Sequence, residues 1–433
     1  MRETELILYT DCEEGSLLQN MSWLMENYDS EFYNREDKVS LLYECFHDLM
    51  SITAEHGFYG NLWHCYLTNL CVNHENAYST ACEIVGTIEG SINELALHDF
   101  TIFKEYFEYD FTDMFQKLQV TALSIMLHYE GSSSISKIYN DRIRTTICTT
   151  AVRLDEAKNP AEMKDIMTGF YRSFGVGKFG LHKAFRIIHK EENDQAEIIP
   201  ILRIAHVHLD DLIGYEIAKQ KLIDNTEAFV QGKKANNCLL FGDAGTGKSS
   251  SIKAIVNEYY DRGLRIIEVY KHQFKDLNDV IAQVKNRHYK FIIYMDDLSF
   301  EEFEIEYKYL KAVIEGGMEK KPDNVLIYAT SNRRHLIKEN YADKDDRREE
   351  DMHSGDTVQE KLSLVARFGV SIFFGAPTRA QFQTIVKQLA KKNQVRMSEP
   401  DLLAEANKWE LSHGGLSGRT AQQFIDYLLG RQS

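Results

Sequence analysis

A glycine-rich loop near the middle of the chain has the residue types and spacing of a phosphate-binding P-loop. It follows the apolar run Cys238–Phe241 and precedes a helical stretch, Ser251–Tyr259, which is the strand–loop–helix setting that the motif requires. Glycines let backbone N–H groups turn inward around phosphates, and the following helix adds its positive N-terminus. Nucleotide contacts are therefore expected from one continuous segment: Gly242, Asp243, Ala244, Gly245, Thr246, Gly247, Lys248, Ser249 and Ser250.

Two residues of this loop have distinct predicted roles. Lys248 is expected to reach the β- and γ-phosphates of ATP, and the Ser249 hydroxyl is expected to bind Mg²⁺. The competing interpretation is a simple glycine turn before a helix. A complete match to the motif arises by chance in about 1–2% of chains of this length and composition, so the P-loop interpretation is favoured.

A second acidic element follows at a later strand end. The apolar run Phe291–Met295 is followed by Asp296 and Asp297. Carboxylates at the carboxyl end of a strand lie in the crevice where α/β sheets bind ligands. Asp296 is expected to hold the magnesium ion through water, and Asp297 to polarise the attacking water, where many ATPases carry glutamate. Glu301 and Glu302 are alternative bases.

Composition places the chain among soluble globular proteins. The length of 433 residues is enough for two or three domains, and the hydrophobic content of 43% is ordinary for a globular protein. No apolar run is long enough to span a bilayer. The N-terminus has acidic residues where a signal peptide needs a basic start and an apolar stretch. The seven cysteines form no C-x-x-C pair and are interpreted as reduced thiols. We expect a cytoplasmic protein without a membrane partner.

Charge divides the chain unevenly. Residues 1–130 contain 5 Lys and Arg against 23 Asp and Glu, whereas the whole chain contains 50 and 66. An acidic surface repels nucleic-acid phosphates, so a nucleic-acid clamp in this third of the chain is not favoured. A solvated helical surface is the simplest interpretation, and a basic protein partner is the alternative.

Hydrophobic spacing predicts the secondary structure on either side of the polar run His189–Gln195. Before it, apolar stripes at helical spacing predict an all-helical domain: Val39, Leu42, Tyr43, Phe46, Leu49 and Met50; Tyr78, Ala81, Val85, Ile88, Ile92 and Leu95; Phe103, Phe107, Phe111, Met114 and Leu118. After it, short apolar runs alternating with helical stretches predict a parallel α/β sheet: Cys238–Phe241, Leu264–Tyr270, Phe291–Met295, Val325–Ala329 and Val370–Phe374.

Four further segments accompany the P-loop in chain order. Leu212–Glu216 precedes it, Thr330–Asn332 ends the run Val325–Ala329, and Ala366–Gly369 precedes the last predicted strand. Gly414–Ala421 opens the final helix of a helical stretch that begins at Thr378, and Ser417 or a neighbouring glycine is expected to cap it.

With these segments, the chain from about residue 200 to its end resembles AAA+ ATPases. It is most similar to a bacterial family of predicted AAA+ ATPases without assigned function, distantly similar to helicase loaders and replication initiators. The resemblance implies apolar adenine contacts from Ile213 and Tyr215. It also implies a sensor 1 role for Asn332 and a sensor 2 role for Arg419. Arg367 is implied as the finger that reaches a neighbour's site; its planar guanidinium suits phosphate oxygens, and Arg333 and Arg334 are rivals.

The expected architecture is an acidic all-helical domain at 1–195, an AAA+ α/β core at 196–377 and a helical lid at 378–433. The expected function is Mg²⁺-dependent ATP binding and hydrolysis, coupled to self-assembly or to remodelling of an unknown partner that the N-terminal domain contacts. The alternatives are an ATP-controlled binding switch with little turnover, which Asp297 in place of glutamate keeps open, and a nucleic-acid-associated loader.

Overall fold

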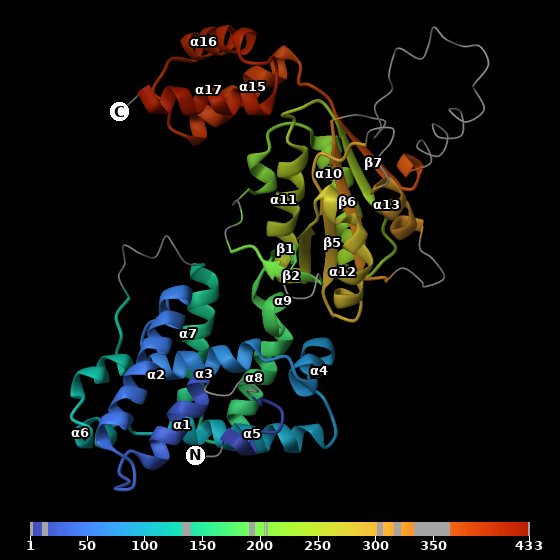
Figure 1. Ribbon diagram of the computed structural model, residues 1–433. Coiled ribbons are helices and arrows are strands. Elements are labelled where there is room, and N and C mark those ends of the chain that lie inside the picture. Colours follow the sequence, from blue (N-terminus) through green and yellow to red (C-terminus); the bar gives the residue numbers. More distant parts are fainter. Residues whose placement is uncertain are drawn as a thin grey trace. The chain divides into compact units, whose positions relative to one another are not determined.

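The computed structural model describes residues 3–10, 16–131, 140–189, 195–202, 204, 207–300, 306–315, 322–332 and 364–431. The chain divides into two compact units, Met1–Leu181 and His182–Ser433, here called the helical unit and the α/β unit (Figure 1). Glu301, Glu302, Arg333 and Arg334 lie outside the described residues. Within the described ranges, no helix has the length and apolar character needed to cross a membrane.

The helical unit confirms the predicted all-helical N-terminal region. Asparagine caps five of its helices (α2, α3, α4, α7 and α8), because the side-chain oxygen accepts N–H groups that the first turn leaves unpaired. The helices are α1 (Leu17–Asn27), α2 (Arg35–His56), α3 (Leu62–Asn73), α4 (Ala77–Val85), α5 (Ile92–Phe107), α6 (Thr112–Lys117), α7 (Asp141–Asp155), α8 (Pro160–Phe174) and α9 (Gly177–Leu181).

A buried carboxylate fixes the start of the chain in this unit. Asp99 on α5 is fully buried and accepts backbone N–H groups from Ile7 at 3.0 Å, Leu8 at 2.7 Å and Tyr9 at 3.1 Å. Tyr9 is buried as well, and its hydroxyl lies 2.9 Å from that of Tyr171 on α8. These contacts hold residues 7–9 in the core of the unit.

The predicted apolar stripes are buried unevenly. All five members of the third stripe, from Phe103 to Leu118, are buried. In contrast, Tyr43 is 51%, Val85 69% and Leu95 39% exposed, so the prediction of a core position was wrong for these three. The physical reason is clear for the second stripe: α4 ends at Val85 and α5 begins at Ile92, so one helical period does not run through both.

A seven-stranded sheet forms the centre of the α/β unit, in the order β2-β1-β4-β5-β6-β3-β7. All neighbours are parallel except β1 and β2, which are antiparallel. The five strands predicted from apolar runs are present, and β1 and β2 add to them. The strands are β1 (Ala184–His189), β2 (Ala196–Pro200), β3 (Cys238–Gly242), β4 (Leu264–Glu268), β5 (Lys290–Met295), β6 (Val325–Ser331) and β7 (Val370–Phe374).

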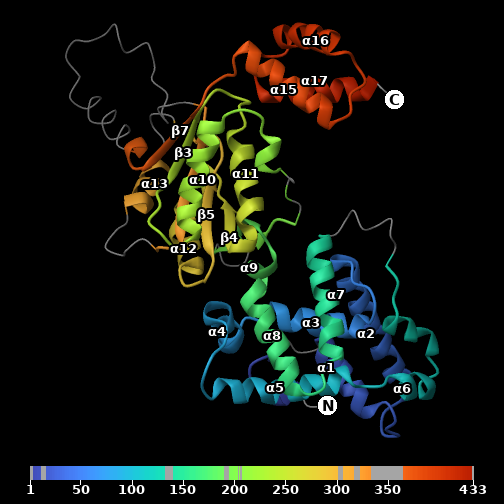
Figure 2. The same ribbon diagram turned by 180° about the vertical axis from the view of Figure 1, so that it is seen from behind.

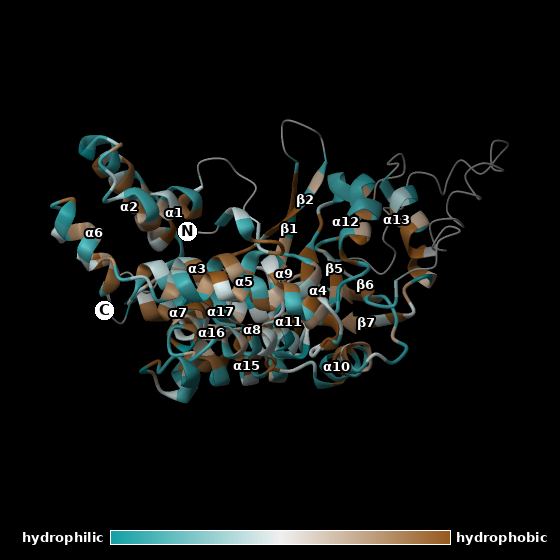
Figure 3. Ribbon diagram, turned by 90° about the horizontal axis from the view of Figure 1, so that it is seen from below, coloured by the Kyte–Doolittle hydropathy of each residue, from teal (hydrophilic) through white to brown (hydrophobic). Residues whose placement is uncertain are grey.

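Helices cover both faces of this sheet. Apolar residues of α10 (Glu216–Val230) and α11 (Lys248–Tyr259) form one core with side chains from one face of the strands. Figures 1 and 2 show α12 (Leu277–Val284) and α13 (Glu306–Glu315) on the opposite face. Burial on both faces explains why the central strands are almost continuously apolar, as the brown strands in Figure 3 show.

The predicted C-terminal helices are present and form a small core of their own. They are α15 (Arg379–Lys392), α16 (Glu399–Ser412) and α17 (Gly418–Arg431), here called the lid. Thr378 and Ser398 cap the first two helices, and the Ser417 hydroxyl accepts the Thr420 N–H at 3.0 Å, which confirms the predicted cap of α17. The predicted fold class, a P-loop α/β sheet with a helical lid and a helical N-terminal region, is confirmed.

Along the chain, the boundary between the two compact units falls between Leu181 and His182, whereas the boundary predicted from the sequence lies at residue 195. β1 belongs to the α/β unit, because residues Ala184, Phe185 and Arg186 pair with β4. The polar run His189–Gln195 joins the antiparallel strands β1 and β2, and its residues 190–194 lie outside the described part of the chain. The boundary between core and lid at 377 and 378 stays a prediction, since both parts belong to one compact unit.

Candidate nucleotide-binding site

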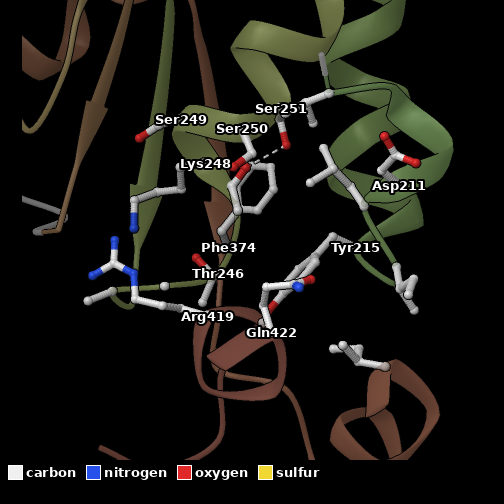
Figure 4. Close-up of a pocket in the computed structure, with 18 of the residues that line it drawn as sticks. Asp211, Tyr215, Thr246, Lys248, Ser249, Ser250, Ser251, Phe374, Arg419 and Gln422 are labelled. Atoms are coloured by element: carbon white, nitrogen blue, oxygen red, sulfur yellow. Dashed lines mark hydrogen bonds between the residues drawn. The ribbon is translucent and has the colours of Figure 1, made fainter. Parts of the chain in front are cut away.

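A cavity of about 870 Å³ lies at the carboxyl ends of the central strands. The strands β3, β5 and β6 end together at this edge, because Met295 is in register with Ala329 and Phe241 with Ser331. The loops that follow these ends line the cavity together with residues of α15 and α17 (Figure 4). Its place agrees with the general rule that parallel α/β sheets bind ligands at the carboxyl ends of their strands.

The glycines of the P-loop allow a conformation and a packing that other residues resist. Gly242, Gly245 and Gly247 have φ angles of 134°, 74° and 91°. A Cβ atom on Gly242 would lie 2.1 Å from the Phe374 carbonyl oxygen. The loop therefore lies directly against the end of β7, and the Asp243 carboxylate accepts the Ala376 N–H at 2.7 Å.

Lys248 is buried at the first turn of α11 and points along the loop. Its Nζ atom donates to the carbonyl oxygens of Gly242 at 2.9 Å and Asp243 at 2.6 Å, and to Asn332 Oδ1 at 3.0 Å. Burial lowers the pKa of Lys248, while the carboxylates of Asp243, Asp297 and Asp296 act in the opposite direction. The ammonium group is thus held at the cavity wall by neutral oxygen atoms.

Asp296 and Ser249, the two residues predicted to bind magnesium, are in contact. The Ser249 hydroxyl donates to Asp296 Oδ1 at 2.7 Å, and the Thr330 hydroxyl donates to the same oxygen at 2.5 Å. Burial favours the protonated acid, but the hydrogen bonds from Thr330 and Ser249, together with the nearby Tyr294 hydroxyl, outweigh it, and the pKa of Asp296 lies below its ordinary value. An ionised carboxylate beside a hydroxyl supplies hard oxygen ligands, which suit Mg²⁺.

Asp297 and Asn332 form a second contact between neighbouring strands. The Asn332 side-chain amide donates to Asp297 Oδ1 at 2.7 Å, while its own oxygen accepts from Lys248. Asp297 has a φ angle of 49°, a left-handed conformation that is uncommon for a residue other than glycine. Its N–H donates to the Thr330 hydroxyl at 2.9 Å, which holds this turn in place.

The predicted adenine contacts, Ile213 and Tyr215, both line the cavity. Ile213 packs against the core of the lid, and the Tyr215 ring lies 5.4 Å from that of Phe374. Burial, with a smaller contribution from Asp243, raises the pKa of Tyr215 to about 12. Ile213, which packs against the lid, and Tyr215, which packs against Phe374 of the sheet, therefore border one part of the cavity.

The lid contacts the P-loop through the first turn of α17. The Arg419 N–H donates to the Gly245 carbonyl at 3.1 Å, and a Cβ atom on Gly245 would lie 2.9 Å from Ser417 Oγ. Figure 4 shows the side chains of Arg419 and Lys248 directed toward the same part of the cavity. Two cations thus approach one region that the backbone N–H groups of the loop also border.

Arg367 lies elsewhere. It precedes β7, whose first residue, Val370, is in register with Cys238 at the start of β3. Because β3 and β7 are parallel, Arg367 lies at the amino edge of the sheet, whereas the P-loop lies at the carboxyl edge. Arg367 therefore does not line the cavity of its own chain. Its rivals Arg333 and Arg334 are outside the described residues.

Two features of the cavity were missed from the sequence. Thr330 links Asp296 to the backbone of Asp297, although the sequence predicted it only as part of a strand end. Asp211 and Lys392 form an ion pair between the segment before α10 and the end of α15. A polar threonine at the carboxyl end of an otherwise apolar run was a usable signal for Thr330. The ion pair joins positions far apart in sequence, so no local pattern indicates it.

Two curated proteins are similar to short stretches of the chain. The large subunit of replication factor C from Staphylothermus marinus is 32% identical over 81 residues, which is 18% of either chain. The corresponding subunit from Methanococcus maripaludis is 38% identical over 76 residues, 18% of this chain and 15% of that protein. The chain thus spans less than a fifth of the length of these curated relatives.

Solved structures are similar over about half of the chain. A RuvB mutant of Thermotoga maritima matches with 18% identity and a TM-score of 0.37, covering 52% of this chain and 67% of that one. The AAA domain of FIGL-1 in complex with ADP matches with 15% identity and a TM-score of 0.36, covering 53% and 74%. At these scores the fold assignment rests on the strand order, the P-loop and the lid of this chain.

A family model matches the α/β unit almost from end to end, over residues 181–432. The match covers more than half of the chain and confirms the expected likeness to a family without assigned function. The chain belongs to the family described as "Protein of unknown function (DUF815)".

Proposed function

We propose that the cavity binds ATP with Mg²⁺ and that the protein hydrolyses the nucleotide. The observation that carries this proposal is the convergence of Lys248, Ser249, Asp296 and Asn332 at one end of the cavity, each in hydrogen-bond contact with another. The phosphates would lie along the P-loop backbone and exchange the carbonyl partners of Lys248 for phosphate oxygens. The adenine base of the nucleotide would lie between Ile213 and Tyr215.

Ser249 and Asp296 are the residues that would hold Mg²⁺. When bound, the ion supplies charge neutralisation on the phosphate oxygens. Within the described part of the chain, no group of three or more His, Cys, Asp and Glu side chains could hold a metal by itself. This agrees with a magnesium ion that keeps several waters and uses substrate phosphates as ligands.

Asp297 is the proposed general base of the hydrolysis reaction. Its carboxylate reaches the cavity and is oriented by the Asn332 amide at 2.7 Å. An ionised carboxylate in this position can accept a proton from water as the water attacks the terminal phosphate. Arg419, extending from the lid, would stabilise the negative charge that develops on the phosphoryl oxygens.

Phosphate release by the purified chain tests this assignment. Unmodified protein should release phosphate from ATP in the presence of Mg²⁺, and Lys248→Ala should abolish release. Asp297→Asn should retain ATP binding and lose turnover. If Lys248→Ala and unmodified protein release phosphate at the same rate, the P-loop is not the catalytic site and the proposal fails.

An ATP-controlled switch with little turnover is the second candidate. It is favoured by one observation: Asp297 is one methylene shorter than glutamate and is already bonded to Asn332. In this case ATP would order the lid against the P-loop, through contacts such as that of Arg419 with Gly245. ATP binding without measurable phosphate release would support the switch and exclude hydrolysis.

Arg367 is proposed to act in the site of a neighbouring subunit, because it lies at the edge of the sheet opposite its own P-loop. Mixing two inactive variants tests this role. Lys248→Ala has no working P-loop but supplies Arg367, whereas Arg367→Ala has a working P-loop but lacks the arginine. The mixture should recover part of the turnover, and a mixture as inactive as its components would remove Arg367 from the proposal.

The helical unit is proposed to contact a protein rather than nucleic acid. Its acidic excess, 23 acidic against 5 basic residues in positions 1–130, repels phosphate backbones. Turnover measured with and without single- and double-stranded DNA tests this preference. We expect no stimulation, and a salt-sensitive stimulation would favour the nucleic-acid-associated loader instead.

A further inference from the structure

Two thiols of the helical unit are in contact. Cys65 on α3 and Cys148 on α7 have their sulfur atoms 3.8 Å apart, and the side chains are 2% and 3% exposed. The Cys65 sulfur also lies 3.4 Å from the Tyr59 carbonyl oxygen. The two helices therefore present the thiols to one another inside the unit, with the sulfur of each as a neighbour of the other.

The separation is small enough for a disulfide. A disulfide bond is ~2.05 Å long, so the sulfurs must approach by about 1.8 Å, which side-chain rotation with a small helix shift can supply. The other described cysteines, Cys45, Cys71, Cys82 and Cys238, are also free and buried. Burial alone thus does not distinguish the pair; the contact between its sulfur atoms does.

We propose that Cys65 and Cys148 form a reversible oxidation site, in which a hydroperoxide converts the two thiols into a disulfide that joins α3 to α7. In the first step the sulfur of Cys148 attacks the peroxide O–O bond, forming a sulfenic acid and releasing water. In the second step the sulfur of Cys65 attacks the sulfenic sulfur, forming the S–S bond and releasing a second water. Two thiols lose two electrons and two protons, and one hydrogen peroxide is reduced to two waters.

The order of the two steps follows from the hydrogen bond within the pair. Cys65 donates to Cys148, and this bond lowers the pKa of the Cys148 thiol and raises that of Cys65. Arg144, one turn away on α7, acts in the same direction on Cys148. Because the thiolate is the nucleophile, the first attack on the oxidant is assigned to Cys148.

The Cys65–Cys148 disulfide would restrain α7, a helix that also contacts the last residue of the helical unit. Near the start of α7, Arg142 donates to the carbonyl oxygen of Leu181, the last residue of the helical unit. A covalent link between positions 65 and 148 closes a long loop and limits the unfolded chain, so it should raise the melting temperature of the helical unit on the order of 10 °C.

Peptide mapping of the full chain tests the site without reference to ATP turnover. The reduced protein is treated with hydrogen peroxide, denatured, alkylated, digested and analysed by mass spectrometry. We expect a linked pair of peptides that contain Cys65 and Cys148, two hydrogens lighter than the separate peptides. Dithiothreitol should restore both thiols and the lower melting temperature.

Variants separate this site from general oxidation. Cys65→Ser and Cys148→Ser should each abolish the linked peptide and the rise in melting temperature, whereas Cys45→Ser, a matched change at another buried cysteine, should retain both. Measurements on unmodified protein decide the matter if a variant does not fold. Full alkylation of Cys65 and Cys148 after peroxide treatment, their separate conversion to sulfinic acids, or a link to another cysteine would overturn the proposal.

Discussion

Asp99 in the helical unit and Asp296 in the α/β unit are both held by several donors, but the donors differ in kind. Asp99 is fully buried and accepts the backbone N–H groups of Ile7, Leu8 and Tyr9. Asp296 accepts the hydroxyls of Ser249 and Thr330 and lines a cavity. Backbone donors are fixed by the fold, whereas hydroxyls can rotate toward a ligand. The first carboxylate therefore holds structure, and the second can exchange partners.

The largest effect is expected at the neighbour of Asp296 in the cavity. Asp297→Asn removes the proposed base while the asparagine still fits beside Asn332, so turnover should fall by about 10²- to 10⁴-fold, with ATP affinity within a few-fold of the parent. Asp297→Glu should retain turnover. Phosphate release and calorimetric ATP binding measure the two quantities. Equal turnover of Asp297→Asn and the parent would show that another group is the base.

The second largest effect is expected from Asp99→Asn, on stability instead of turnover. The asparagine amide lacks the negative charge that the three backbone N–H groups stabilise. Each of these charge-assisted hydrogen bonds contributes at most about 1.5–3 kcal/mol to the free energy of unfolding. We expect the helical unit to unfold at lower urea concentration and ATP affinity to stay unchanged. Asp48→Asn, at an exposed position on α2, is the matched control. Loss of ATP binding with unchanged stability would contradict the structural role of Asp99.

Removing one hydroxyl at Asp296 is expected to have an intermediate effect. Thr330→Val keeps the shape of a buried strand residue but deletes the donor 2.5 Å from Asp296 and the acceptor of the Asp297 N–H. The loss of one charge-assisted bond, about 1.5–3 kcal/mol, should weaken Mg²⁺-dependent ATP binding by at least roughly 10-fold. Titration of ATP binding against Mg²⁺ measures it. An unchanged Mg²⁺ requirement would separate Thr330 from the metal site.

The smallest effect is the pH dependence that the same carboxylate adds. The pKa of Asp296 is lower in the folded protein than its ordinary 3.8, so the folded state favours the ionised form. Its contribution to stability is present above pH 3.8 and is lost as pH falls through the lowered folded value. The slope is at most about 1.4 kcal/mol per pH unit. Urea unfolding between pH 3 and 5 should show a shallower slope for Asp296→Asn than for the parent.

The features that could be predicted from the sequence have short local patterns. The P-loop, the paired aspartates after β5 and the arginine at the start of α17 are short motifs, and the structure brings these residues to one cavity. Five strands followed from continuous apolar runs, because a sheet covered on both faces has no polar side. Each of these signals lies within a few residues of the feature that it predicts.

The features that were missed depend on long-range contacts. β1 carries Arg186 and His189 in a short segment, and its place in the sheet is decided by pairing with β4, about eighty positions later. The ion pair of Asp211 with Lys392 and the contact of Arg419 with Gly245 arise only when the lid is folded beside the P-loop. The pairing of Cys65 with Cys148 similarly requires two helices to be placed in space.

Calorimetric titration with Mg-ATP tests the central claim most directly. The unmodified chain should bind one ATP, and Lys248→Ala should lose three hydrogen-bond donor directions at the phosphates, weakening binding at least about 100-fold. Lys233→Ala, an exposed lysine after α10, is the matched control and should bind as the parent does. Equal ATP affinity of Lys248→Ala and Lys233→Ala would contradict the account.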